Sequence, residues 1–481
     1  MGNRIACAAV SVVVSASACG PNDADPADAS SSSSAEQPTT IVPNDSTSDG
    51  SSTTGSTATT TSETTASDES SDTGSRVDDC TEFDTFVAAL IDAGGETRAG
   101  LVDGYRFDAM YSEHGLPLHC EGRLITIAWD PDATTLALTG DFSDWDPAAH
   151  PMTKPFDDFP LWIADIAIEE PLAPSLYKLV RDGDTFVADP WARRFGWDEF
   201  GEYSLTDARD TAGHHERWIG FAEGVGALTA RDVVVYVPTG ALQRDGLAVL
   251  YMHDGQNLFS PDAFFGGWHV GEAVEQALVN GDLAPTLVVG IDNTELRFDE
   301  YTHVQDDIGG GLVGGRADEY ADFVALGVKP FIDARYPTDP DRDATTVLGS
   351  SLGGLVSLYI AWRHPDVFAS AGSMSGTLGW GTIGASNDRI LELYAATPPD
   401  DLWVYLDSGG NGPCPGGEDT PRPGRADSDN FCVTIEMRDL LVELGWAEPQ
   451  TLVYAHAPGA THDEAAWAAR LPGFLTALGD R

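Results

Sequence analysis

The chain has 481 residues, of which 42% are hydrophobic and 21% charged, and its 26 Lys and Arg against 77 Asp and Glu give a formal net charge of −51. This length gives room for two or three domains, each with a hydrophobic core large enough to fold without disulfide bonds or metals. Length and composition together exclude a membrane-embedded helix bundle and a miniprotein held together only by disulfides. A surface this negative repels phosphate backbones, and the lysines are confined to Lys154, Lys178 and Lys329, so we expect no nucleic-acid partner.

Residues 1–19 have the build of an export signal: one arginine, an apolar stretch over residues 5–14, and small residues up to Cys19. The apolar stretch is too short for a permanent membrane span. Residues 16–19 resemble a bacterial lipobox, although Ala replaces the usual Leu at its first position. This predicts a lipid anchor on Cys19 and, from the glycine that follows, an outer-membrane lipoprotein. Ordinary cleavage after Ala18, giving a secreted protein, is the alternative.

Residues 20–79 are largely Ser, Thr, Asp and Pro, with almost no large apolar side chain. Such a segment cannot bury enough surface to offset the entropy of ordering, so it predicts a disordered linker. From residue 80 to 120 apolar side chains recur at helical spacing, which predicts a helical lead-in. These side chains are Phe83, Phe86, Val87, Leu90 and Ile91.

Four cysteines follow the signal segment: Cys80, Cys120, Cys414 and Cys432. An even number in an exported chain favours disulfide bonds. Pairing of nearest neighbours joins Cys80 to Cys120 and Cys414 to Cys432, but four cysteines allow three connectivities. A zinc site is the competing interpretation, and the missing C-x-x-C spacing disfavours it, so we predict no metal.

Residues 121–205 contain short alternating segments separated by Asp, Pro and Gly turns, a pattern typical of a small antiparallel β sandwich. Within them stand Gly140-Asp141-Phe142 with Trp145, Leu161-Trp162, Tyr177-Lys178, Asp182-Gly183 and Asp189-Pro190-Trp191. Together these pieces resemble the early-set, glycogen-binding-like domains that precede many glucan-active enzymes and secreted esterases. The resemblance makes Trp162 and Lys178 the positions to test for glucan binding. The alternative is that Trp129, Trp145 and Trp162 are core residues.

From about residue 225 to 481 short apolar runs alternate with helical stretches. The runs cover residues 233–238, 248–255, 286–292, 345–349, 368–375, 402–409 and 451–459. This alternation predicts an α/β domain with a mostly parallel central sheet and helices on both faces. Ligands of such sheets bind at the carboxyl ends of the strands.

The sequence GSSLGG at residues 349–354 fits the pattern G-x-S-x-G centred on Ser351. It lies between a predicted buried strand and a predicted helix, and the flanking glycines relieve the crowding of such a turn. The turn exposes the Ser351 hydroxyl at the helix N-terminus, where free amides, Leu352 first, favour a developing oxyanion. Ser351 is therefore the predicted nucleophile.

A serine hydroxyl needs a base, and His462 follows the last apolar run, where this strand order places it. His456 lies inside that run, which indicates a structural role. His253, beside the predicted oxyanion loop, is a less favoured candidate for the base. The second oxyanion donor is expected from a backbone amide after the run that ends near residue 253, at Gly255 or Gln256.

The third member of a triad is expected in the loop after the run 402–409. The candidate carboxylates in and next to this loop are Asp407, Glu418, Asp419, Asp427 and Asp429. We favour Asp429 or Asp427, because both precede a predicted helix and a Cys414–Cys432 bridge would hold them. Glu418 and Asp419 are expected to be solvated loop charges.

Motifs over residues 225–480 occur in an ordered series: MHDGQNLF (252–259), Gly267-Trp268, Arg297 with Glu300-Tyr301-Thr302, Tyr320, Phe323, KPFID (329–333), Tyr336-Pro337-Thr338, GSSLGG, His364-Pro365 with Phe368, Ser375-Gly376, and His462 with Trp467. This region resembles the serine esterase family of the enterochelin esterase, esterase D and feruloyl esterase type. The resemblance implies an α/β hydrolase, no cofactor, and acyl transfer through Ser351 to water. The chain departs from the family pattern in the extended loop that carries the acid. Arg297, Glu300 and Tyr301 either shape the pocket or form a structural ion pair.

The sequence thus predicts an exported serine esterase that acts on a small-molecule or polysaccharide-linked ester, such as a sugar-linked or siderophore ester, and touches the membrane only through its lipid anchor. A lipid-anchored carbohydrate-binding protein with an inactive hydrolase domain is the alternative. A peptidase or acyltransferase would use the same triad, because the triad does not set the acceptor.

Overall fold

The computed structural model describes residues 70–169, 173–222, 228–411, 414 and 429–481. The chain divides into two units, residues 1–66 and 67–481, and the described residues belong to the second. The predicted signal segment with Cys19, and the predicted linker as far as residue 69, lie outside them. None of the helices described combines the length and the hydrophobicity that a membrane span requires.

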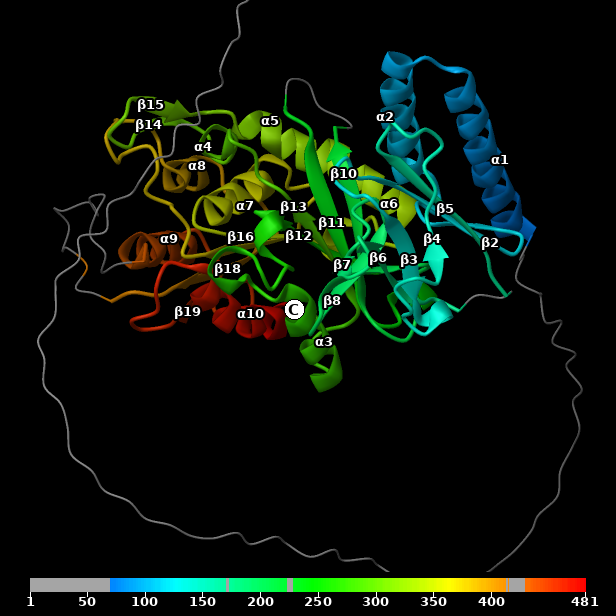
Figure 1. The fold of residues 1–481 in the computed structure, drawn as a ribbon. Coiled ribbons are helices and arrows are strands. Elements are labelled where there is room, and N and C mark those ends of the chain that lie inside the picture. The colour runs from blue at the N-terminus through cyan, green and yellow to red at the C-terminus, as the bar shows by residue number, and fades with distance from the viewer. Residues whose placement is uncertain (1–69, 170–172, 223–227, 412–413, 415–428) are drawn as a thin grey trace, which may run out of the picture. The chain divides into compact units, whose positions relative to one another are not determined.

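Two helices precede the first strand, α1 (Ser70–Asp92) and α2 (Gly95–Tyr111) (Figure 1). Phe83, Leu90 and Val102 are buried in a common core with strand residues. Helix α1 begins inside the segment predicted to be a disordered linker, so residues 70–79 correct that prediction. Once the buried part of a helix has formed, each added residue gains a hydrogen bond without a new nucleation cost, so polar residues can extend it.

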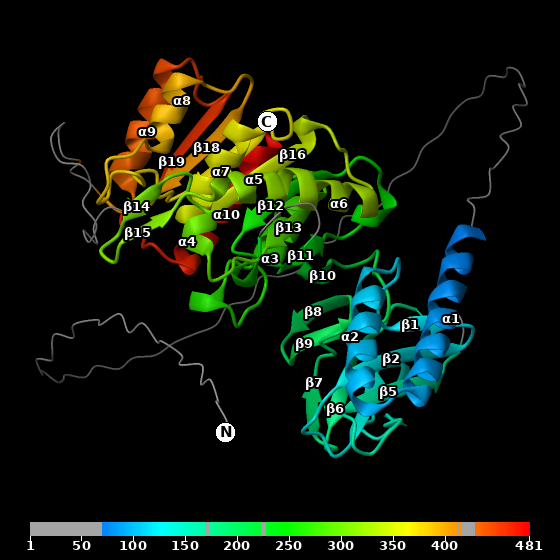
Figure 2. The ribbon, with the colours of Figure 1, turned by 90° about the horizontal axis from the view of Figure 1, so that it is seen from above.

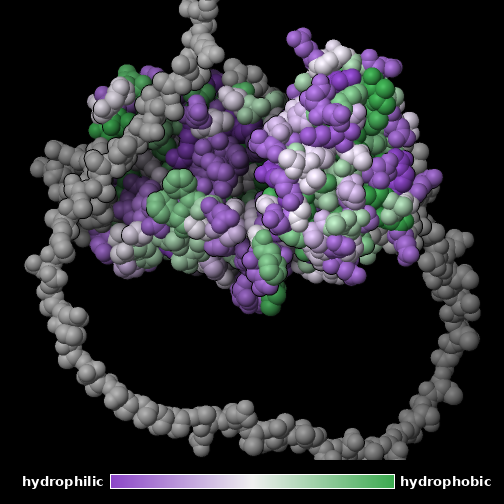
Figure 3. Space-filling model, in the orientation of Figure 1, coloured by the Kyte–Doolittle hydropathy of each residue, from purple (hydrophilic) through white to green (hydrophobic). Residues whose placement is uncertain are grey.

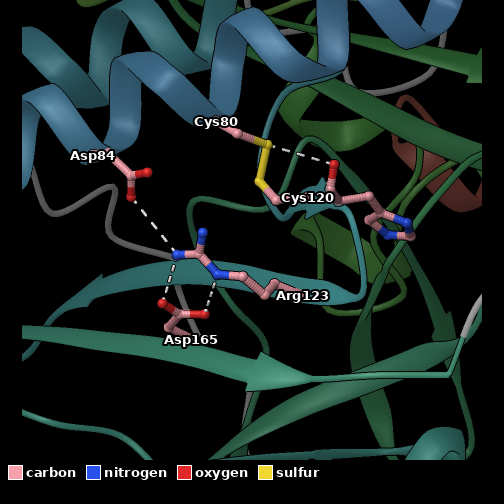
Figure 4. The surroundings of a disulfide bond; sticks show 6 residues. Cys80, Asp84, Cys120, Arg123 and Asp165 are labelled. Carbon is pink, nitrogen blue, oxygen red and sulfur yellow. Dashed lines mark hydrogen bonds and ion pairs between the residues drawn. A yellow bond between two sulfur atoms is a disulfide. The ribbon is translucent and has the colours of Figure 1, made fainter.

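A disulfide between Cys80 and Cys120 ties α1 to strand β1 (Leu118–Cys120), with the two Cα atoms 5.9 Å apart (Figure 4). Nearby, Arg123 forms a bidentate ion pair with Asp165 at 2.9 and 2.7 Å and lies 3.7 Å from Asp84 on α1. Cys414 and Cys432 form the second disulfide. Of the three possible connectivities the structure therefore has the nearest-neighbour one, and the zinc interpretation is wrong for these cysteines.

The sandwich consists of two sheets whose side chains meet in one core. One sheet has the order β1-β2-β5, and the other continues the order β10-β8-β9-β6-β3-β4 with β7 on β6. The strands are β1 (Leu118–Cys120), β2 (Arg123–Trp129), β3 (Leu136–Gly140), β4 (His150–Pro151), β5 (Leu161–Ala167), β6 (Leu176–Arg181), β7 (Thr185–Val187), β8 (Arg194–Asp198), β9 (Gly201–Leu205) and β10 (His214–Phe221).

Both faces of the β1-β2-β5 sheet are buried. On β2, Ile125 and Ile127 face the helices α1 and α2, whereas Leu124 and Ala128 face the second sheet. Figure 2 shows α1 and α2 alongside this sheet. A strand covered on both faces has no polar face, which explains the nearly continuous apolar run of β2.

The two positions singled out for glucan binding are not exposed. Trp162 is 5% exposed and donates through Nε1 to the Asp130 carbonyl at 3.1 Å. Lys178 is also 5% exposed, and its Nζ donates to the Phe200 carbonyl at 2.7 Å. The glucan-binding expectation for these two side chains is therefore wrong, and Trp162 is a core residue, whereas Trp129 is exposed at the surface and Trp145 is half-buried.

The second sandwich sheet runs without a break into the sheet of the larger domain. Strand β10 pairs antiparallel with β8 on one side and with β11 on the other. The order continues β11-β13-β12-β16-β17-β18-β19, and every pair from β13 to β19 is parallel. These strands are β11 (Arg231–Val237), β12 (Ala248–His253), β13 (Thr286–Ile291), β16 (Thr345–Ser350), β17 (Ser370–Met374), β18 (Trp403–Ser408) and β19 (Leu452–His456), with a separate hairpin of β14 (Gln305–Asp307) and β15 (Leu312–Gly314).

Helices cover both faces of this sheet, which confirms the predicted α/β fold. On β12, Val249 and Tyr251 belong to the core on one face, and Leu250 and Met252 to the core on the other. The first core includes side chains of α5, α6, α7, α8 and α9, and the second those of α3 and α10. The helices are α3 (Val270–Asn280), α4 (Arg297–Glu300), α5 (Ala317–Asp322), α6 (Lys329–Arg335), α7 (Leu352–Arg363), α8 (Ile390–Ala396), α9 (Phe431–Glu443) and α10 (Glu464–Gly479).

The buried side chain of Glu216 links the two parts of the sheet. Its carboxylate accepts hydrogen bonds from Arg194 Nε on β8 and from the hydroxyl of Tyr336, which follows α6, both at 2.8 Å. Burial raises the pKa of the Glu216 carboxyl, but the charge of Arg194 and the contact with His214 outweigh it, so the pKa lies well below its usual range.

We predict that Glu216→Gln destabilises the protein by about 3–5 kcal/mol at pH 7, because it leaves Arg194 without its closest counter-charge. A carboxyl whose pKa is lower in the folded state stabilises the fold above its unfolded pKa of about 4.3 and loses that contribution as the pH falls. Urea unfolding from pH 7 to pH 3 should therefore show the difference between wild type and variant shrinking. A constant difference would contradict this assignment.

Candidate active site

Ser351 lies in a strained turn between β16 and α7. Its backbone has φ 55° and ψ −123°, a conformation that residues other than glycine rarely adopt. A Cβ placed on Gly349 would lie 2.5 Å from the carbonyl carbon of Gly353. The turn therefore requires glycine at position 349, and it presents the Ser351 side chain at the N-terminus of α7.

The half-buried Ser351 hydroxyl lies 3.4 Å from the hydroxyl of Thr377. The Thr377 amide in turn donates to the Ser351 carbonyl at 2.9 Å. Among the described residues no hydrogen bond joins Ser351 to His462. Hydrogen bonds between a nucleophile and its base are often long in the absence of substrate and shorten when substrate binds.

His462 precedes α10 and contacts Asp429, which stands just before α9. The distance from His462 Nδ1 to Asp429 Oδ1 is 2.5 Å, and the side chains are 38% and 3% exposed. Because a carboxylate only accepts, Nδ1 carries the proton and Nε2 keeps a free lone pair. Asp427, the other favoured acid, lies outside the described residues, as do Glu418 and Asp419.

Asp407 lies within β18 and is fully buried. Arg470 Nε donates to Asp407 Oδ2 at 3.2 Å. Burial raises the pKa of the Asp407 carboxyl to about 6, although Arg470 opposes the shift. Asp407 therefore pairs with Arg470, whereas the carboxylate that contacts His462 belongs to Asp429.

The two rival histidines have other partners. His456 Nε2 lies 3.2 Å from the Gly410 carbonyl, and its ring stacks on Phe431 with centroids 4.3 Å apart. His253 Nδ1 lies 2.9 Å from the Tyr320 hydroxyl, and burial lowers the His253 pKa to about 3. A histidine with so low a pKa is a weak proton acceptor near pH 7, which favours His462 over His253 as the base.

The predicted oxyanion residues lie on two neighbouring segments. Leu352 is the first residue of α7, where backbone amides have no partner within the helix. Gly255 and Gln256 belong to a single helical turn, residues 255–257, directly after β12. A Cβ on Gly255 would lie 2.6 Å from Asp292 Oδ1, so this close approach requires glycine.

Two ion pairs lie near the turn of residues 255–257. Arg297 binds Asp254 through Nε and Nη2 at 2.7 and 2.8 Å, and Asn293 Nδ2 donates to the same carboxylate at 2.6 Å. Glu300 pairs with Arg231 at 2.9 Å, with both side chains almost completely buried. Arg297 and Glu300 thus each form an ion pair, but not with one another.

Sequence reasoning missed two residues behind the His462–Asp429 pair, Ser375 and Arg470. Ser375 Oγ donates to Asp429 Oδ2 at 2.6 Å, and Arg470 Nη2 donates to Ser375 Oγ at 2.7 Å. Ser375 is the last residue of a predicted strand run and part of the Ser375-Gly376 motif, which was the available signal, although neither assigned it a contact with the acid. Nothing in the local sequence marks Arg470, because it lies in the middle of a helix.

The parallel sheet and the strained serine turn at the end of β16 define an α/β hydrolase. Residues 229–478 match the family described as "Putative esterase". The chain belongs to this esterase family. In the part of the chain that the structure describes, no group of three His, Cys, Asp or Glu side chains is arranged to hold a metal ion.

The chain is also similar to individual known proteins. It is 25% identical to the uncharacterized protein YbbA of Bacillus subtilis over 178 residues, which are 35% of this chain and 64% of that protein. It is 28% identical to the iron(III) salmochelin esterase of Escherichia coli over 179 residues, 36% of this chain and 38% of that protein. The chain thus spans less than two thirds of the length of either relative. The enterobactin esterase of Shigella flexneri aligns with 74% of this chain and 93% of its own, with a TM-score of 0.41 and 15% identity.

We predict that Gly349→Ala destabilises the protein by about 1–3 kcal/mol, because the new methyl group meets backbone atoms that cannot move without opening the turn. Gly473→Ala is the matched control. A Cβ at position 473 meets nothing within 4 Å, and alanine favours the helix. Chemical unfolding of both variants tests this, and equal stability of the two would show that the turn tolerates a side chain.

Proposed function

We propose that this protein is an exported serine esterase that hydrolyses carboxylic esters through Ser351, His462 and Asp429. The observation that carries the proposal is the contact between His462 Nδ1 and the buried Asp429 carboxylate, which leaves Nε2 free to accept a proton. The strained turn that presents Ser351, and membership of the esterase family, support it further.

In the proposed reaction His462 Nε2 takes the proton of the Ser351 hydroxyl as Oγ attacks the ester carbonyl carbon. The carbonyl oxygen becomes an oxyanion, which in this scheme the amide of Leu352 and that of Gly255 or Gln256 stabilise. The protonated His462 then gives its proton to the leaving alcohol, and the C–O bond breaks to form an acyl-enzyme. Water, deprotonated by His462, attacks the acyl carbon, and Ser351 leaves with the proton.

Asp429 has two functions in this scheme. It holds the imidazole in the tautomer with Nδ1 protonated, and its charge stabilises the imidazolium that forms while His462 carries the serine proton. The carboxylate does not itself become protonated. Cys432, which forms a disulfide with Cys414, lies three residues after Asp429 and ties the chain next to it.

For the substrate we propose an ester linked to a sugar or to a siderophore. Similarity to a protein named iron(III) salmochelin esterase supports the siderophore class. The formal net charge of −51 disfavours capture of strongly anionic ligands and supports a neutral sugar-linked ester. Figure 3 shows hydrophilic residues over much of the visible face, with hydrophobic ones in small separate patches.

For location we propose the cell envelope, with the chain exported by residues 1–19 and anchored through a lipid on Cys19. The two disulfides support an oxidising compartment outside the cytoplasm. Mass spectrometry of the mature N-terminus separates a lipidated Cys19 from simple cleavage after Ala18.

We predict that Ser351→Ala lowers kcat for short-chain p-nitrophenyl esters by at least about 10³-fold, because the acyl-enzyme can no longer form. Release of p-nitrophenol by the purified protein measures this loss. A folded wild type that turns over none of acetyl, butyryl and feruloyl esters would instead favour the carbohydrate-binding alternative.

We predict that Asp429→Asn lowers kcat by about 10²–10⁴-fold and that Asp427→Asn leaves it within about twofold. The amide cannot stabilise the imidazolium and favours the wrong imidazole tautomer. Steady-state kinetics of both variants decide between the two acids. The reverse pattern would assign the acid to Asp427.

A further inference from the structure

The oxygen of Asp429 that faces away from His462 is held by a set of donors. Asp429 Oδ2 accepts a hydrogen bond from the Gly409 amide at 2.5 Å and from the Ser375 hydroxyl at 2.6 Å. Arg470 Nη2 lies 3.8 Å from the same oxygen. These contacts come from three different segments, so they restrict rotation of the carboxylate about its Cβ–Cγ bond.

The direction of the Ser375 proton follows from counting donors and acceptors. Trp467 Nε1 lies 3.2 Å and Arg470 Nη2 2.7 Å from Ser375 Oγ, and both groups can only donate. They occupy the two lone pairs of the hydroxyl. Its single proton is therefore left for Asp429 Oδ2, and Ser375, which is fully buried, has no alternative orientation.

Arg470 is itself fixed between the Asp407 carboxylate and the Ser375 hydroxyl. Its Nε binds the buried carboxylate of Asp407, while its Nη2 binds Ser375. The Arg470 and Asp407 side chains are 9% and 0% exposed, so solvent screens their interaction only weakly. Helix α10 carries both Trp467 and Arg470 and begins two residues after His462, which couples the two donors to the base.

We propose that Ser375 is a positioning residue for the esterase reaction. Its hydroxyl, oriented by Arg470 and Trp467, turns the Asp429 carboxylate so that Oδ1 faces His462 Nδ1 and Nε2 faces Ser351. The expected effect of Ser375 on kcat rests on the proposed function. The orientation of Asp429 can be tested without substrate. Ser375 touches no reacting atom and acts through Asp429 alone.

The charged groups that contact the His462–Asp429 pair, stand next to it in the chain or lie behind it come from several elements. They are Asp429 before α9, Asp407 on β18, and Asp463, Glu464 and Arg470 at or within α10. Replacing Ser375 changes none of these charges. A change in the His462–Asp429 contact in such a variant therefore reports orientation rather than an altered local charge.

The experiment compares Ser375→Ala with Ser357→Ala in the purified protein. Ser357 is an equally buried serine whose hydroxyl donates to the Gly353 carbonyl of its own helix at 2.8 Å and has no other hydrogen bond among the described residues. We expect Ser375→Ala to lower kcat for p-nitrophenyl butyrate about 10–100-fold with KM within about twofold, and Ser357→Ala to leave both nearly unchanged. Wild-type kcat in a folded Ser375→Ala variant would overturn the proposal.

The second readout is the low-field proton NMR signal of His462 Nδ1–H, assigned by its loss in His462→Gln. We expect this signal in wild type and in Ser357→Ala, and its loss or broadening in Ser375→Ala. A sharp, unshifted signal in Ser375→Ala would show that the hydroxyl does not position Asp429. Should wild type show the signal but hydrolyse no ester, the proposed function fails while the positioning role is still decided by the NMR comparison.

Removing the Ser375 hydroxyl leaves two buried donors unpaired, which can prevent folding. Trp467→Phe provides the second variant, since it keeps an aromatic ring beside His462 but removes one of the donors that orient Ser375. We expect a smaller fall in kcat and a broadened His462 signal. Wild-type kcat and an unchanged signal in Trp467→Phe would contradict the orientation argument by themselves.

Discussion

Parallel pairing of β12, β13 and β16 to β19 is the constraint on which the site depends. Strands that run in the same direction bring their carboxyl ends to one edge of the sheet. The register aligns Ser350 with Met374, Met374 with Asp407, and Ser408 with His456. The residues that follow these strand ends include Ser351, Ser375, Gly409 and His462, which are far apart in sequence and lie together because of the register.

The buried charges at this edge of the sheet are paired with one another and with neighbouring donors. Asp429 and Asp407 are almost fully buried carboxylates, and an isolated buried charge costs several kcal/mol. Arg470 lies between them, and the Gly409 amide and the Ser375 hydroxyl supply further donors to Asp429. The contacts that stabilise the buried Asp429 carboxylate also fix its orientation. The stability of the buried charge and the orientation of His462 therefore depend on the same contacts.

The sandwich and the hydrolase part share one sheet through β10. This strand falls between the two predicted domains, at 121–205 and 225–481, and its antiparallel pairing with β8 and β11 removes the free edge that each part would otherwise expose. Glu216 and its contacts with Arg194 and Tyr336 lie at this junction. A separation of the two parts would therefore break main-chain pairing as well as buried side-chain hydrogen bonds.

The sequence by itself determined the α/β class and the serine turn, because hydrophobic periodicity and glycine spacing are local properties of the chain. For the disulfides it left three connectivities open, and the structure selected the nearest-neighbour one. The sequence placed His462 after the last strand and narrowed the acid to Asp429 or Asp427. Only the tertiary structure decided that Asp429 contacts His462, that Trp162 and Lys178 are buried, and that Ser375 and Arg470 lie behind Asp429. These depend on strand register and on the faces that the sheets and helices cover, and long-range packing of this kind leaves no local pattern in the sequence.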